Sequence, residues 1–76
     1  MNKQRREEIK KLTSELEGIT NRIEEIRDEE QEYLDNIPEN MQGGERYEVA
    51  EAAISNLDEA ISSAEAASSA LEDAAE

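Results

Sequence analysis

The chain contains no cysteine and no histidine, and two tyrosines are its only aromatic residues. Without cysteine there is no disulfide framework, and without either residue there is no structural zinc site of the usual kind. A chain of 76 residues is close to the size at which such staples are commonly needed, because a small fold buries little surface. The sequence therefore predicts one small domain, over residues 1–76, that depends on helix packing or on self-association.

The residues that usually perform catalysis are also missing. A serine nucleophile needs an adjacent activating base, and the serines of this chain have no histidine to provide one. Gly43 and Gly44 follow no strand and lack the remaining residues of a phosphate-binding loop. We therefore expect no enzymatic activity, no catalytic residue and no cofactor.

Long apolar runs are absent as well. A membrane-spanning helix needs about 20 consecutive, mostly apolar residues, and the chain has no such run. The N-terminal segment MNKQRREEIKK is basic, but the apolar stretch of a secretory signal does not follow it. The expectation is a cytoplasmic protein that does not enter a membrane.

Apolar residues recur regularly in the first half of the chain, in alternating steps of three and four residues. The predicted seam contains Ile9, Leu12, Leu16, Ile19, Ile23, Ile26, Glu30, Tyr33 and Ile37. This spacing is typical of a coiled coil and predicts a helix over residues 3–35. Glu30 is the charged member of the seam, and it either marks fraying near the end of the helix or fixes the register.

A connection and a second helix follow. Pro38 disfavours helical geometry at the residue before it, so residues 36–44 are predicted as a loop in which Ile37 and Met41 cover the end of the core. The spacing then resumes with Tyr47, Ala50, Ile54, Leu57, Ile61, Ala64, Ser68, Leu71 and Ala75. This pattern predicts a helix over residues 45–75 and an all-α, antiparallel two-helix coiled-coil hairpin.

A row of alanines runs beside the second seam, with one member every seven residues: Ala53, Ala60, Ala67 and Ala74. The row makes the apolar stripe wider than a single partner helix requires. It favours a homodimer in which two hairpins form a four-helix bundle, with these alanines at the interface. The alternative is that alanine is simply a good helix former on an exposed surface.

The charges are distributed unevenly along the chain, whose net charge is -13. Residues 1–11 contain five basic and two acidic residues, whereas the other 65 residues contain three basic and 19 acidic ones. Folding back would place the basic N-terminus beside the acidic residues 65–76, which supports antiparallel pairing. Individual exposed pairs contribute only about 0 to 1 kcal/mol, so they influence orientation more than stability.

Acidic residues accumulate where the first helix meets the loop. Residues 24–39 contain eight of them against one arginine. The candidate partner-binding residues are Glu25, Asp28, Glu29, Glu32, Asp35 and Glu39. Their field would repel nucleic acid and membranes and attract a basic protein surface, and carboxylates along a rod can resemble the phosphates of a nucleic acid. The alternative is a solvated face that only keeps the rod in solution.

A metal site is not expected among these acids. Bundle metal sites combine inward-facing glutamates with a Glu-x-x-His motif, and the chain has no histidine. The two tyrosines, Tyr33 and Tyr47, are candidate aromatic anchors for a partner, although both also belong to the seams and could serve the core instead.

The segment IRDEEQEYLDNIPENMQGGERYEVAEAAISNLDEAISS, residues 26–63, resembles small uncharacterised acidic helical proteins of phages and mobile elements of low-GC Gram-positive bacteria. Its most distinctive part is DNIPENMQGGERYE, residues 35–48. The resemblance implies a phage context, in which many small acidic proteins inhibit host nucleic-acid enzymes or defence systems such as CRISPR effectors.

These observations predict an acidic protein-binding module, namely a phage-type inhibitor or nucleic-acid mimic that blocks a host DNA- or RNA-binding protein. The alternative is a structural coiled coil that assembles with itself and has no inhibitory activity.

Overall fold

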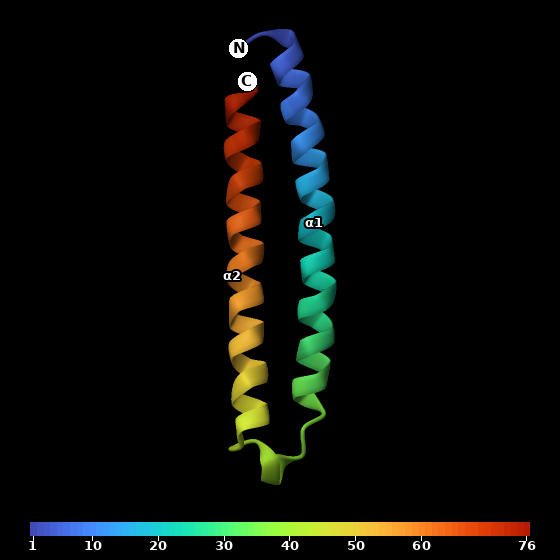
Figure 1. Ribbon diagram of the computed structural model, residues 1–76, viewed down its shortest axis with the longest axis vertical. Helices are drawn as coiled ribbons and strands as arrows, with labels where there is room; N and C mark the ends of the chain where they lie inside the picture. Colours follow the sequence, from blue (N-terminus) through green and yellow to red (C-terminus); the bar gives the residue numbers. More distant parts are fainter.

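A computed structural model describes all 76 residues and shows two long helices packed against each other, with no strands (Figure 1). Helix α1 spans Lys3–Asp35, the short 3-10 helix η1 spans Glu39–Met41, and α2 spans Glu45–Ala74. The chain folds back on itself, so both termini lie at one end of a rod with extents of 59 × 14 × 12 Å. We call this end the terminal end and the opposite one the loop end. Neither helix contains a segment long and apolar enough to cross a membrane.

Local hydrogen bonds define where α1 begins and ends. Asn2 precedes the helix, and its Oδ1 accepts a hydrogen bond from the backbone N–H of Arg5 at 2.8 Å. This satisfies one of the amides that have no partner in the first turn of a helix. At the other end, Asn36 donates its backbone N–H to the carbonyl of Glu32 at 3.1 Å, and Pro38 follows two residues later. Because proline has no N–H and disfavours helical geometry at the preceding residue, α1 cannot continue through it.

The most deeply buried apolar residues cluster near the loop end: Leu34, Ile37, Ala50 and Ile54, with Tyr47 packed against them. Ile37 is only 4% exposed, as the sequence predicted for its role in covering this core. Met41 is 46% exposed, so the same prediction for Met41 was wrong. Its backbone closes the turn instead, donating to the Pro38 carbonyl at 2.8 Å and accepting from the Gly44 N–H at 3.1 Å.

The seam predicted for α2 lies against α1 along its whole length. Every one of its nine residues is buried or half-buried. In α1, by contrast, four of the nine predicted seam residues lie outside the interface, with exposures between 42 and 53%: Leu12, Ile19, Ile26 and Tyr33. The residues that follow them in sequence are buried or half-buried instead, namely Thr13, Thr20, Arg27 and Leu34. The sequence prediction for these four seam positions was therefore wrong.

The reason is that the spacing of residues allows either of two rows of α1 to complete the seam: the predicted row that begins at Leu12 or the observed row that begins at Thr13. On a helix, residues three and four positions after a given residue both lie beside it, so the row of Ile9, Leu16 and Ile23 has a neighbour on either flank. The structure uses the flank that contains threonines. Thr13 Oγ1 donates to the Ile9 carbonyl and Thr20 Oγ1 to the Leu16 carbonyl, both at 2.9 Å.

These hydroxyl groups are therefore satisfied within α1, and no buried side-chain polar atom of the hairpin lacks a partner. The facing part of α2 has small residues in its seam, among them Ala64 and Ser68. A compact threonine suits such a thin interface. As a result, α1 is rotated about its own axis relative to the orientation that the predicted seam implies. Its larger apolar residues therefore flank the interface.

Candidate protein-binding surfaces

One side of the rod carries the exposed apolar row of α1. Its members are spaced by seven residues: Leu12, Ile19, Ile26 and Tyr33. The corresponding flank of α2 has the same spacing: Arg46, Ala53, Ala60, Ala67 and Ala74. Arg46 connects the two rows, because its Nε donates to the Tyr33 hydroxyl at 2.7 Å and its guanidinium carbon lies 5.4 Å from the centre of the Tyr33 ring.

Because both rows advance by seven residues along antiparallel helices, the contact between Tyr33 and Arg46 places both rows on the same side of the rod. We call these nine residues the apolar side. Ala53 is half-buried in the hairpin, and the three alanines after it are exposed. Near the loop end, Tyr33, Arg46 and the exposed Val49 line a shallow hollow on this side, together with Glu30, Glu45 and Ala50.

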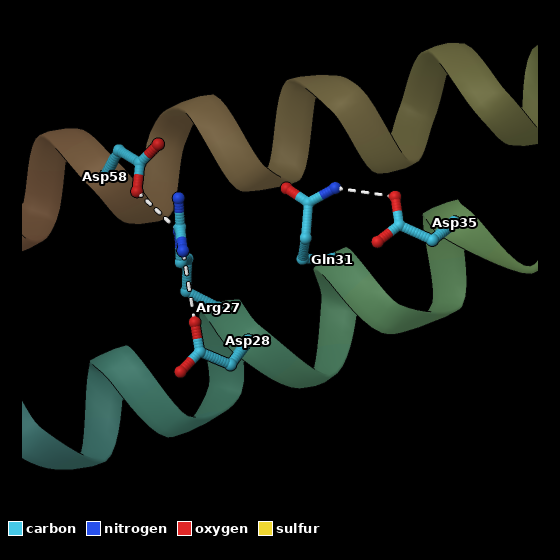
Figure 2. A network of polar contacts seen from close by, with 5 residues as sticks. All are labelled: Arg27, Asp28, Gln31, Asp35 and Asp58. Carbon is cyan, nitrogen blue, oxygen red and sulfur yellow. Dashed lines mark hydrogen bonds and ion pairs between the residues drawn. The ribbon is translucent and has the colours of Figure 1, made fainter.

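The opposite side of the rod is acidic. On α2, four acidic residues are again spaced by seven: Glu51, Asp58, Glu65 and Glu72. Arg27 of α1 donates its Nε to Asp58 Oδ1 at 2.8 Å, which shows that this α2 row borders α1 (Figure 2). Further toward the terminal end, Glu17, Glu24 and Glu65 line one shallow hollow between the helices. We call the four α2 acids together with Glu17 and Glu24 the acidic side.

Arg27 makes the only ion pair that joins the two helices. Its Nη1 also donates to Asp28 Oδ1 at 3.1 Å (Figure 2). The side chain of Arg27 is 35% exposed. The hydrogen bond to Asp28 foremost, and then the hydrogen bond and charge of Asp58, raise the pKa of Arg27 above its ordinary value. Since a guanidinium is ionised at every working pH, this pair adds no pH dependence from the arginine.

The six partner-binding candidates from the sequence are all exposed, and we call them the loop-end acids: Glu25, Asp28, Glu29, Glu32, Asp35 and Glu39. The first five share one broad face of α1 by their spacing, and because all five are exposed this face points away from α2. Three of them already accept hydrogen bonds from neighbours in α1. These bonds are Arg22 to Glu25 at 3.0 Å, Arg27 to Asp28 at 3.1 Å, and Gln31 to Asp35 at 3.0 Å. Figure 2 shows the last two of them.

The acidic side was missed as a candidate site from sequence. Its signal was present, because the four acids of α2 follow one another at heptad spacing just as the alanines do. Charge density along the chain indicates the loop-end acids, but it does not reveal charge periodicity. Only the register of the two helices shows that these acids and two glutamates of α1 lie on one side of the rod.

The two tyrosines have different environments. Tyr47 packs against the buried cluster at the loop end, whereas Tyr33 is exposed on the apolar side. The carboxylates do not converge, and no group of three or more is arranged to hold a metal ion. What the arrangement offers chemically is two surfaces of opposite character, one apolar and one carboxylate-rich.

No protein-family model, curated protein or solved structure matches the chain.

Proposed function

We propose that this chain is a protein-binding module whose acidic surface occupies the nucleic-acid-binding site of a basic partner protein. The observation that supports the proposal is the segregation of charge. The loop-end acids and the acidic side present carboxylates over two adjoining faces, whereas the two rows of the apolar side contain no acidic residue. A surface of one charge sign attracts a surface of the opposite sign and raises the association rate.

Charge density favours a pair of hairpins over a single one as the active form. One hairpin carries -13 along 59 Å, or one net charge per roughly 4.5 Å, against about 1.7 Å for duplex DNA. Two hairpins side by side would carry one net charge per roughly 2.3 Å. The homodimeric four-helix bundle expected from the sequence therefore belongs to this proposal, because it brings the rod close to the charge density of a duplex.

The proposed partner is a host DNA- or RNA-binding protein, including defence proteins such as CRISPR effectors, encountered in the cytoplasm. Charge complementarity supports the class of partner, and the resemblance of residues 26–63 to proteins of phages and mobile elements supports the setting. The second candidate is a structural coiled coil that only assembles with itself. The exposed apolar row of α1 is the observation that favours this second function.

The test compares two variants with the same net charge. The acidic-side variant carries Glu51→Gln, Asp58→Asn, Glu65→Gln and Glu72→Gln. The loop-end variant carries Glu25→Gln, Asp28→Asn, Glu29→Gln and Glu32→Gln. Each set of four neutral replacements changes the net charge from -13 to -9.

Tagged wild-type chain and both variants are incubated with lysate of a low-GC Gram-positive bacterium, and retained proteins are identified by mass spectrometry. The proposal predicts nucleic-acid-binding proteins that are retained at low salt, released by high salt or by a duplex oligonucleotide, and lost with at least one variant. The variant that loses them identifies the face that binds. Retention that resists salt and oligonucleotide and is equal for all three proteins would reject the acidic-surface function.

A further inference from the structure

The apolar side has no partner within the hairpin, although it exposes a leucine, two isoleucines and a tyrosine in one row. We propose that a second copy of the chain covers it, and that the two copies lie head to tail, with the loop end of each beside the terminal end of the other. This inference concerns the face opposite the acidic side and holds whether or not the acidic surface binds any protein.

The dimensions of the rod suit a dimer. One side measures 59 by 14 Å, which is roughly 800 Å², and each partner in a standard stable interface contributes about 800 Å². A surface with so few charges in its two central rows is also the kind that forms the core of an interface. A twofold axis would pair the same side of both copies, so one chain supplies both halves of the contact.

Charge decides the relative direction of the copies. At the loop end, residues 24–39 and 45–58 carry twelve acidic and two basic residues, a net of -10. At the terminal end, residues 1–11 and 65–76 carry six acidic and five basic residues, a net of -1. Placing two loop ends together would set the two strongly negative regions against each other. The head-to-tail arrangement separates them and gives each one a nearly neutral neighbour.

The exposed row of α1 fits this arrangement. Its midpoint lies between Ile19 and Ile26. Reversing one copy about that point keeps every member of the row within the contact and brings Leu12 to the level of Tyr33 of the second copy. The two α2 helices then meet through their alanines, which allow their backbones to approach closely.

The oligomeric state is measured by sedimentation velocity on the purified full chain over a range of concentrations. We expect a concentration-dependent dimer for the wild-type chain. Ile19→Glu should raise the dimer dissociation constant at least about 100-fold, because it buries two unpaired carboxylates. The matched control is Asn21→Glu, which adds the same charge next to the hollow of the acidic side and should leave the dimer intact.

Far-ultraviolet circular dichroism checks that both variants remain helical, and Ala60→Glu offers an independent change on α2. A wild-type chain that stays monomeric at every concentration would overturn the proposal. So would a dimer that survives both Ile19→Glu and Ala60→Glu. Because only the purified chain is present, neither result depends on the outcome for a basic partner.

The direction of the copies is measured with a spin label on Gln42→Cys, in the exposed loop of a chain that has no other cysteine. The head-to-tail dimer predicts a distance between the two labels comparable to the 59 Å length of the rod. A short distance, close to the 14 Å width, would show the loop ends side by side and overturn the head-to-tail arrangement.

Discussion

Ala50 and Ala66 are identical residues of the same helix in opposite surroundings. Ala50 is 1% exposed and belongs to the buried cluster at the loop end, whereas Ala66 faces solvent. A closely packed site has no room for added atoms, so a larger side chain forces the surrounding residues to move and lowers the free energy of unfolding. An exposed helix position has no such constraint.

Replacement of each alanine by leucine measures this difference. We expect Ala50→Leu to lower the free energy of unfolding by about 1 to 3 kcal/mol through overpacking. Ala66→Leu should change it by less than about 0.5 kcal/mol, because alanine and leucine have similar helix propensities. Urea denaturation followed by circular dichroism gives both values, and equal effects at the two positions would contradict the observed packing.

Gly18 is the only glycine inside either helix. A Cβ atom added there would have no neighbour within 4 Å, so the site tolerates a side chain. Gly18→Ala should therefore raise the free energy of unfolding by about 0.4 to 1 kcal/mol, because alanine loses less backbone freedom on folding. Gly44→Ala serves as the control: its Cβ would lie 3.3 Å from the Met41 carbonyl oxygen, and we expect no comparable gain in the urea midpoint.

At the scale of the helices, the spacing of apolar residues determined most of the fold. Residues 3–35 and 45–75 were expected to be helical, and the structure has helices over Lys3–Asp35 and Glu45–Ala74. All nine seam positions of α2 were placed correctly. The spacing could not choose between the two flanks of the Ile9, Leu16 and Ile23 row, because residues three and four apart are both neighbours on a helix.

Which flank of the Ile9, Leu16 and Ile23 row enters the interface depends on the side chains of α2 that it meets. A flank with two threonines is a poor candidate when only hydrophobicity is considered, yet their hydroxyls are satisfied inside α1. Such local bonds are not visible in a pattern of apolar spacing. The acidic side could not be predicted in the same way, because it combines residues of α1 and α2 and depends on how the two helices are aligned. The loop-end acids were easier to find because they are close together in sequence.

The Arg27–Asp58 pair is the one ionic contact between the helices, and its energetic role can be measured. The Arg27 and Asp58 side chains are 35% and 50% exposed, so solvent screens their attraction. A double-mutant cycle with Arg27→Ala and Asp58→Ala should give a coupling energy below about 1 kcal/mol that decreases further with added salt. A coupling of several kcal/mol would show that this pair, and not apolar contact, holds the helices together.

For the molecule as a whole, the turned position of α1 has two consequences. It leaves the interface of a single hairpin thin, with four buried apolar residues in its core. It also gathers the large apolar side chains left over on one side of the rod. The opposite side and the outer face of α1 carry the acidic side and the loop-end acids, and further exposed acids lie elsewhere on α2, among them Glu48, Glu59 and Asp73. A second copy would therefore add buried apolar surface without covering the acidic side.

The most direct test of this arrangement compares neighbouring residues of α1. Ile19→Cys and Thr20→Cys are single-cysteine variants of a chain without native cysteine, and their thiol-labelling rates report which side chain faces solvent. At low concentration we predict fast labelling of Ile19→Cys and slow labelling of Thr20→Cys, with the rate for Ile19→Cys falling as concentration rises and the apolar side is covered. Faster labelling of Thr20→Cys at every concentration would contradict the turned position of α1 and, with it, the apolar side.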